Sequence, residues 1–173
     1  MPHIPIPDIF ADSIFYITPR FLQEHSIVYL LIDLDNTLAP YGMATPTHEL
    51  QYWVETMKKA GVELYIVSNN RGKRPALYAE ILGIGHVRAA RKPGTAKLVE
   101  LLKQKGIVKE KAALVGDQIY ADVLCAHRVG IKSILVRPIS MKNPLVALRY
   151  WLEAPFRSIG RKKYMEARKS EQS

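Results

Sequence analysis

Apolar residues along the chain fall into short continuous runs, separated by longer segments in which they recur every three or four positions. The clearest run, residues 27–33, is rich in β-branched side chains and ends in an aspartate, as expected for a strand covered on both faces of a parallel sheet. Similar runs predict strands at 62–67, 112–115 and 133–136, with a weaker candidate at 86–90.

Helical periodicity links these runs and predicts helices over 47–60, 73–82, 94–105 and 119–129. Each is followed by a glycine suited to ending a helix: Gly61, Gly83, Gly106 and Gly130. Strands that alternate with helices imply a parallel sheet with helices on both faces. We therefore expect an α/β fold, a three-layer Rossmann-like arrangement whose ligand site lies beyond the carboxyl ends of the strands.

The length of 173 residues and the apolar fraction of 48% fit one globular domain spanning 1–173. Its core is expected at about 25–140, followed by a distinct C-terminal segment at 141–173. The apolar run between Ile4 and Leu22 is broken by proline and aspartate, so we expect it to pack on the core.

Several classes of protein are disfavoured. No apolar stretch approaches the ~20 residues that span a bilayer, and the N-terminus lacks the features of a signal peptide. The single cysteine, Cys125, cannot form an internal disulfide and is expected to be buried, and the five histidines show no metal-ligand spacing. A cytoplasmic location is therefore expected.

The net charge of +9, from 25 Lys and Arg against 16 Asp and Glu, points to a polyanionic partner: nucleic acid, anionic lipid or a phosphorylated substrate. The excess is concentrated near the C-terminus, where residues 140–173 hold eight Lys or Arg against three Glu.

Within this segment, basic residues are interleaved with Leu145, Leu148, Trp151 and Leu152. Such an amphipathic basic pattern suits the interface of an anionic membrane. It equally suits a terminal helix that packs its apolar face on the domain and carries a solvated basic tail, and the two arrangements are not exclusive.

Polar residues follow three of the predicted strands, at 33–35, 68–70 and 116–117. The carboxyl ends of parallel strands meet at one edge, so these residues should lie together. Asp33 and Asp35 would repel each other unless a cation lay between them or one were protonated, and hard oxygen ligands suit Mg²⁺. Alternatively, both aspartates mark a turn or cap the next helix.

These residues resemble the four ordered motifs of the haloacid dehalogenase superfamily of phosphatases. The matching positions are Asp33-Leu34-Asp35-Asn36-Thr37-Leu38, Ser68, Lys92 before Pro93, and Gly116-Asp117 followed by Asp122. The resemblance implies a fold of the haloacid dehalogenase type and hydrolysis of a phosphomonoester through an aspartyl-phosphate.

By that resemblance, Asp33 is the nucleophile, and Asp35 protonates the leaving group and then deprotonates the attacking water. The implied cofactor is Mg²⁺, held by the Asp33 carboxylate, the Asp35 backbone carbonyl and Asp117.

The resemblance also implies that Thr37, Ser68 and the Asn69 backbone N–H bind the substrate phosphoryl group. Lys92 would stabilise the nucleophile and the developing charge, while Asp122 would either place the metal or orient Lys92. Taken singly, these residues could instead be a Ser-Asn-Asn turn, a solvated lysine and a helix-face carboxylate.

A basic cluster, Arg71, Lys73 and Arg74, follows the second motif. It either contacts a second anionic group of the substrate or forms a solvated helix start.

The chain has no room for the cap domains that usually give this superfamily its selectivity. Only one helix separates Thr37 from the second strand, and one helix and a short strand separate Ser68 from Lys92. An uncapped site suits a large substrate, a membrane surface, or completion by another subunit.

The motif details, together with Leu-Val-Arg-Pro-Ile-Ser at 135–140, are similar to the bacterial YqeG family and to the mitochondrial and plant phosphatidylglycerophosphate phosphatases. That similarity implies removal of the terminal phosphate of this lipid, and peripheral contact with the inner membrane face through 141–173. Two alternatives stay open: a phosphatase of a soluble nucleotide, sugar phosphate or polynucleotide end, and a non-catalytic nucleic-acid-binding protein. No nucleic-acid-binding motif is evident, which disfavours the latter.

Overall fold

The computed structural model describes residues 5–171, and within them the strands form one parallel sheet of six. The strand order is β1-β6-β5-β2-β3-β4. The strands are β1 (Ile9–Phe10), β2 (Tyr29–Ile32), β3 (Glu63–Val67), β4 (Gly85–Val87), β5 (Ala112–Gly116) and β6 (Lys132–Leu135).

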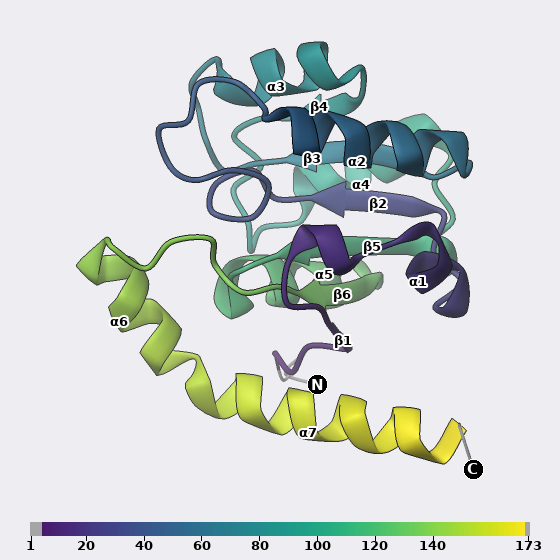
Figure 1. Cartoon of the computed structure of the whole chain (residues 1–173), viewed down its shortest axis with the longest axis vertical. Coiled ribbons are helices and arrows are strands. Elements are labelled where there is room, and N and C mark those ends of the chain that lie inside the picture. Colours follow the sequence, from purple (N-terminus) through teal and green to yellow (C-terminus); the bar gives the residue numbers. More distant parts are fainter. Residues whose placement is uncertain (1–4, 172–173) are drawn as a thin grey trace.

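Helices cover both faces of the sheet (Figure 1), as the alternation of elements predicts. Leu30 and Ile32 of β2 face a core built with α1 (Pro19–Glu24), α2 (His48–Lys59) and α3 (Arg74–Leu82). Leu31 points to the opposite face, which is covered by α4 (Ala96–Lys105) and α5 (Leu124–Val129). The expected three-layer α/β fold is confirmed.

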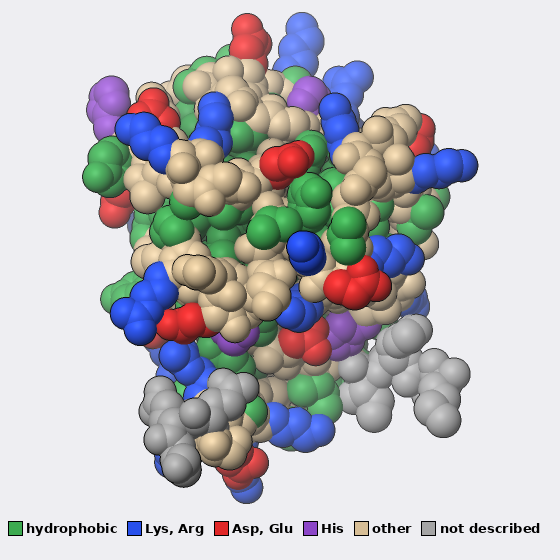
Figure 2. Space-filling view, turned by 90° about the vertical axis from the view of Figure 1, so that its right-hand side faces the viewer, with side chains coloured by type: hydrophobic (Ala, Val, Ile, Leu, Met, Phe, Trp, Pro, Cys, Tyr) green, Lys and Arg blue, Asp and Glu red, His purple; other side chains and the backbone are tan. Residues whose placement is uncertain are grey.

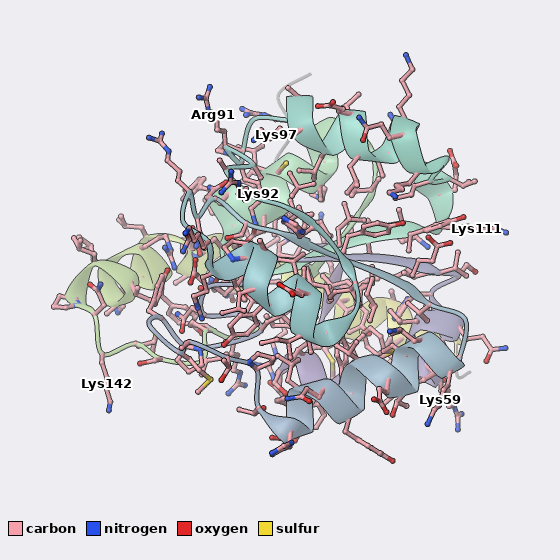
Figure 3. The ribbon with its side chains drawn as sticks, turned by 90° about the horizontal axis from the view of Figure 1, so that it is seen from above. Lys59, Arg91, Lys92, Lys97, Lys111 and Lys142 are labelled. Atoms are coloured by element: carbon pink, nitrogen blue, oxygen red, sulfur yellow. The ribbon has the colours of Figure 1, made fainter. Side chains whose placement is uncertain are left out.

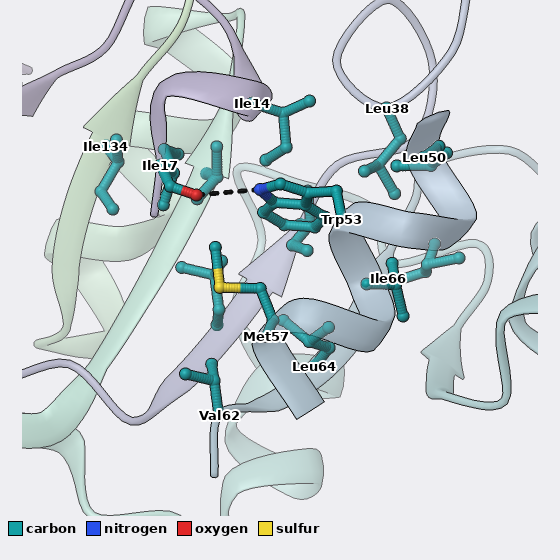
Figure 4. Close-up of a cluster of buried hydrophobic side chains, with 14 of the residues drawn as sticks. Ile14, Ile17, Leu38, Leu50, Trp53, Met57, Val62, Leu64, Ile66 and Ile134 are labelled. Carbon is teal, nitrogen blue, oxygen red and sulfur yellow. Dashed lines mark hydrogen bonds between the residues drawn. The ribbon is translucent and has the colours of Figure 1, made fainter. Parts of the chain in front are cut away.

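The N-terminal run packs on the core over its described part, as expected, and Ile4 lies outside the described residues. Ile14, Ile17 and Leu22 are buried, and the indole N–H of Trp53 donates to the Ile17 carbonyl at 2.8 Å (Figure 4). A buried indole keeps its N–H paired, so this bond fixes the N-terminal segment against α2.

The structure refines several element boundaries. The strand expected at 86–90 is β4, and the helix expected at 119–129 begins as a π-helix, Ile119–Val123, before α5. Two elements were not anticipated, β1 and α1, and short 3-10 helices lie at Ile14–Tyr16 and Lys109–Lys111.

The last two helices, α6 (Pro144–Leu152) and α7 (Ala154–Glu171), follow β6 and run past the β1 edge of the sheet (Figure 1). A Cβ atom added at Gly160 would lie 3.0 Å from Phe10, so α7 packs closely on the strand edge. Among the described residues, no helix combines the length and the apolar character needed to cross a membrane.

Basic residues are spread widely over the surface. Figure 2 shows the face near the amino ends of the strands, where Lys and Arg side chains lie scattered among acidic, histidine and apolar ones. On this face the positive charge forms no single continuous patch of the kind that tracks a nucleic-acid backbone.

Candidate active site

Three neighbouring strands, β5, β2 and β3, deliver polar residues to one edge of the sheet. Asp33 follows β2, Ser68 follows β3, and Asp117 follows β5, and all three are at most 5% exposed. The sequence-based expectation that these residues meet at the carboxyl ends of the strands agrees with this arrangement.

A buried cluster of carboxylates forms the centre of the site. Asp33, Asp117 and Asp122 each offer an oxygen within 4.8 Å of the others. Lys92 Nζ lies 2.7 Å from Asp33 Oδ1 and 2.6 Å from Asp122 Oδ1. The Thr37 hydroxyl donates to Asp117 Oδ1 at 3.4 Å. Asp33 Oδ2 is buried without a hydrogen-bond partner, and a buried carboxylate oxygen of this kind suits a divalent cation.

The electrostatics of the cluster show a shortage of positive charge. Burial raises the pKa of Asp33 to about 8, even though Lys92 acts in the opposite direction. Burial, reinforced by Asp122, raises the pKa of Asp117 to about 6. Burial lowers the pKa of the Lys92 ammonium, but Asp122 and Asp33 outweigh it and raise that pKa above its ordinary value. Lys92, together with Arg149 beside Asp117, thus balances the three carboxylates incompletely, which is a setting in which a metal ion is stabilising.

Lys92 is held inside the site by its neighbours. The Asn69 side chain forms two hydrogen bonds with the Lys92 backbone. Its amide nitrogen donates to the Lys92 carbonyl at 3.0 Å, and its amide oxygen accepts from the Lys92 N–H at 2.7 Å. In Figure 3, Arg91 and Lys142 extend away from the protein, whereas Lys92 lies among the side chains near the ends of the strands. Its side chain is 1% exposed.

Asp35 lies apart from the carboxylate cluster. Its side chain pairs with Arg74 and accepts from Asn70 Nδ2 at 3.3 Å. The Arg74 guanidinium also donates to the carbonyls of Pro40 and Met43, at 2.8 and 2.7 Å. The interpretation of Arg74 as solvated was therefore wrong, since its guanidinium is held by Asp35 and two carbonyls and fixes the orientation of Asp35, while contact with a substrate anion stays a prediction.

Ser68 forms a turn as well as facing the site, because its hydroxyl accepts the Asn70 N–H at 3.1 Å.

Asn36, in the first motif, has a φ of 67°, a conformation that asparagine tolerates better than most residues. Its side chain exchanges hydrogen bonds with the Ser140 backbone at 2.9 and 2.8 Å, which ties the Asp33 loop to the start of the C-terminal segment.

The C-terminal helices contribute residues that the sequence analysis missed. Arg149 lies 3.2 Å from Asp117 Oδ2, and Arg157 donates to the Asp117 carbonyl. Glu153 is fully buried, accepts from Arg157 at 2.7 Å, and accepts from the N–H groups of residues 119–120 at 2.9 and 3.3 Å. The spacing of these charged residues, four positions apart within an apolar stretch, was the available signal, because it places them on one helical face.

The comparisons with known proteins agree with this geometry. A family model described as HAD-hydrolase-like matches residues 89–138, the segment that carries Lys92, Asp117 and Asp122. The chain is 37% identical to the probable phosphatase YqeG of Bacillus subtilis (strain 168), over 82% of both chains. It is 32% identical to phosphatidylglycerophosphate phosphatase 1 of Arabidopsis thaliana, over 81% of this chain but only 41% of that longer protein.

Solved structures support the fold. The putative 3-deoxy-D-manno-octulosonate 8-phosphate phosphatase of Vibrio cholerae has a TM-score of 0.54 at 18% identity, with 80% of this chain and 81% of that chain covered. The corresponding phosphatase of Yersinia pestis has a TM-score of 0.51 at 19% identity, covering 75% and 73%.

The parallel sheet with its carboxylates at one edge, together with the match to the Bacillus phosphatase, defines the class of protein: a phosphatase of the haloacid dehalogenase type. Within that superfamily, the extent of the match to the Bacillus relative is decisive, and the chain belongs to the YqeG family.

Proposed function

We propose that this phosphatase removes the terminal phosphate of phosphatidylglycerophosphate at a membrane surface. The observation that carries the proposal is the position of α6. Its residues Leu145, Leu148, Trp151 and Leu152 are 74%, 58%, 80% and 62% exposed. The same helix sends Arg149 to Asp117. An exposed apolar face thus lies beside the candidate active site.

This apolar face suits the interface of a bilayer. Burying a large apolar side chain gains about 1.5–3 kcal/mol, and the basic residues of the same segment would lie near anionic headgroups. The similarity to the Arabidopsis lipid phosphatase supports the same substrate. Within the part of the chain that the structure describes, the active site also lacks a cap domain. Only α2 lies between the Asp33 loop and β3, and only α3 and β4 lie between Ser68 and Lys92.

In the proposed reaction Asp33 attacks phosphorus and displaces the glycerol oxygen, forming an aspartyl-phosphate. Asp33 Oδ2 is the oxygen without a hydrogen-bond partner, while Oδ1 is held by Lys92. Asp35, oriented by Arg74 and Asn70, protonates the leaving oxygen and then takes a proton from the water that hydrolyses the intermediate.

The phosphoryl group would be bound by Ser68, the Asn69 N–H and Thr37, with Lys92 opposing the charge that develops on its oxygens. The ammonium is already fixed between two carboxylates, so it need not reorganise during the reaction.

Mg²⁺ is the proposed cofactor, because the buried aspartates are hard oxygen donors and one of their oxygens lacks a partner. Asp33, Asp117 and the Asp35 backbone carbonyl would hold it, with Asp122 completing the cluster. When bound, the ion would offset the repulsion between the anionic nucleophile and the anionic phosphate.

A substrate panel tests the lipid assignment. Phosphatidylglycerophosphate in mixed micelles should give a higher kcat/KM than nucleotides, phosphoglycolate or a sugar 8-phosphate. A higher kcat/KM for any of these soluble monoesters would overturn the lipid substrate but leave the phosphatase chemistry in place.

A matched pair of variants tests the role of α6. Trp151→Glu should lower turnover of the lipid in anionic vesicles by about tenfold or more and leave p-nitrophenyl phosphate hydrolysis unchanged. Tyr52→Glu, an exposed aromatic on α2, should affect neither. Deleting 141–173 is a poorer test, because it removes Glu153 and Arg157 from the loop that follows β5. Equal losses on both substrates for Trp151→Glu would exclude docking through α6.

A further inference from the structure

A second cleft lies away from the carboxylate cluster, beneath α7. Its volume is about 590 Å³, within the range of small-molecule sites. It is bounded by α7, the segment that continues β1, and the end of β6. Neither Asp33, Ser68, Lys92 nor Asp117 lines it.

The face of α7 that lines this cleft is unusual. A helix packed on a domain normally turns apolar residues inward. Here the lining includes Arg157, Arg161, Tyr164 and Arg168, spaced so that they lie along one side of the helix. The lining contains four arginines in total, with Arg137, against a single acidic residue.

Three of the four arginines already have acidic partners. Arg137 lies 3.0 Å from Asp12, and Arg168 lies 3.7 Å from Glu24 while its guanidinium sits over the Tyr164 ring at 5.9 Å. These pairs leave little charge on Arg137 and Arg168 for a ligand.

The other two arginines differ, because Arg157 has an acidic partner but keeps one donor without an acceptor, whereas Arg161 has no ion-pair partner among the described residues. Arg157 pairs with Glu153 at 2.7 Å, yet its Nε is buried without an acceptor. Among residues 5–171, Arg161 makes no ion pair or hydrogen bond. The two side chains are four residues apart, so their guanidinium groups can converge on one anion, and arginine is the residue best suited to a phosphate or carboxylate.

The rest of the cleft is mostly apolar and aromatic. Its walls include Phe10, Tyr16, Phe21, Leu135, Tyr150, Tyr164 and Met165. Apart from the charged residues and the tyrosines, Ser158 is the lining residue with a polar side chain. The walls therefore offer few groups that could hydrogen-bond to the base of a nucleotide. An apolar chain fits such walls better than a polar ring system.

We propose that this cleft is a binding site for an anionic lipid, distinct from the active site. The lipid phosphate lies between Arg157 and Arg161, and an acyl chain lies against the aromatic wall. Arg157 also donates to the Asp117 carbonyl, so the cleft and the active-site loop share a residue. The inference does not depend on which phosphomonoester the enzyme hydrolyses.

Titration calorimetry with dihexanoyl phosphatidylglycerol below its critical micelle concentration tests the proposal. This lipid carries a phosphodiester, so a phosphomonoesterase does not consume it. We expect saturable binding of one lipid per chain, with weak or absent binding of dihexanoyl phosphatidylcholine and of AMP. Absence of saturable binding, or equal affinity for AMP, would overturn the lipid site.

Two neighbouring variants locate the site. Arg161→Gln should raise the Kd about fivefold or more, whereas Lys162→Gln, which removes the same charge from the same helix outside the cleft, should change it less than about twofold. Equal effects of the two substitutions on the Kd would mean that overall positive charge attracts the lipid and that this cleft does not bind it specifically. Lipid binding should persist in Asp33→Asn, and loss of binding in that variant would place the lipid in the active site instead. The substrate panel tests which phosphomonoester is hydrolysed, so its outcome does not decide whether this cleft binds lipid.

Discussion

Replacing Lys92 by methionine is the sharpest test of the carboxylate cluster. The Lys92 side chain is 1% exposed and contacts two buried carboxylates at 2.7 and 2.6 Å. Removing one partner of a buried ion pair costs about 3–5 kcal/mol, because the remaining charge is left uncompensated. For a domain of this size, 1 kcal/mol shifts Tm by about 2–4 °C, so Lys92→Met should melt roughly 10 °C below wild type in chelator.

The pH dependence of this loss has a definite sign. Lys92 lowers the pKa of Asp33, so its removal raises further a pKa that burial already raises to about 8. A carboxyl group whose pKa is raised on folding destabilises the native state above its unfolded pKa, and this cost grows with pH until it is complete above the folded pKa. Below about pH 8 Asp33 is protonated in both proteins, so its contribution to the gap between wild type and variant should be widest well above pH 8 and shrink as pH falls to about 8.

Stabilisation of the fold by Mg²⁺ provides a second test of the same carboxylate cluster. A ligand that binds only the native state at 100 times its Kd stabilises by about 2.7 kcal/mol. We expect Mg²⁺ to raise the Tm of Lys92→Met more than that of wild type, since the variant lacks the competing ammonium. Differential scanning fluorimetry of wild type, Lys92→Met and the exposed-site control Lys103→Met measures both effects. If Lys92→Met melts within 2 °C of wild type in chelator at pH 8, the reasoning about uncompensated charge is refuted.

Further predictions concern the nucleophile, the metal site and the sheet edge. Asp33→Asn should lower p-nitrophenyl phosphate turnover by several orders of magnitude with the fold intact, and wild-type turnover would exclude Asp33 as the nucleophile. In Gly116→Ala the new Cβ would collide with the Asp122 carboxylate, so calorimetry should show Mg²⁺ affinity reduced by about tenfold; unchanged affinity would show that Asp122 has no part in the site. Asp8 accepts from the buried Ser133 N–H at 2.8 Å, so Asp8→Ala should cost about 1–2 kcal/mol at pH 7 in urea melts. Burial raises the pKa of Asp8, but hydrogen bonds from a histidine and Ser133 outweigh it and lower that pKa from 3.8, so this contribution should be complete above about pH 3.8 and fade as pH falls below it. A cost that stays constant down to pH 2.5 would contradict the assignment.

Much of the candidate site was predictable, because its signals are local. Apolar runs mark the strands, and the geometry of a parallel sheet brings together the residues that end them, so Asp33, Ser68 and Asp117 could be placed at one edge without coordinates. The sequence left open whether Asp122 places a metal or orients Lys92. In the structure Asp122 contacts Lys92 and also lies within the carboxylate cluster, so its position is compatible with both proposed roles.

The contribution of the C-terminal helices could not be predicted from local pattern. The direction in which α6 leaves β6 decides whether Arg149 and Glu153 face solvent or the Asp117 loop. The spacing of apolar residues along the sequence does not encode that direction. The edge strand β1 escaped notice for a related reason. Its two residues are too few to show an alternating pattern, and its partner strand β6 lies far along the chain.

That edge strand also bears on how the protein folds as it is synthesised. Ile9 pairs with Ile134, and the neighbouring Asp8 bonds to Ser133 across 125 residues of chain. The N-terminal segment leaves the ribosome first, yet its place in the sheet does not exist until β6 has emerged. Until then its apolar side chains stay open to other contacts, and pairing strands this far apart in the sequence is the kind of step that slows folding and exposes a chain to aggregation.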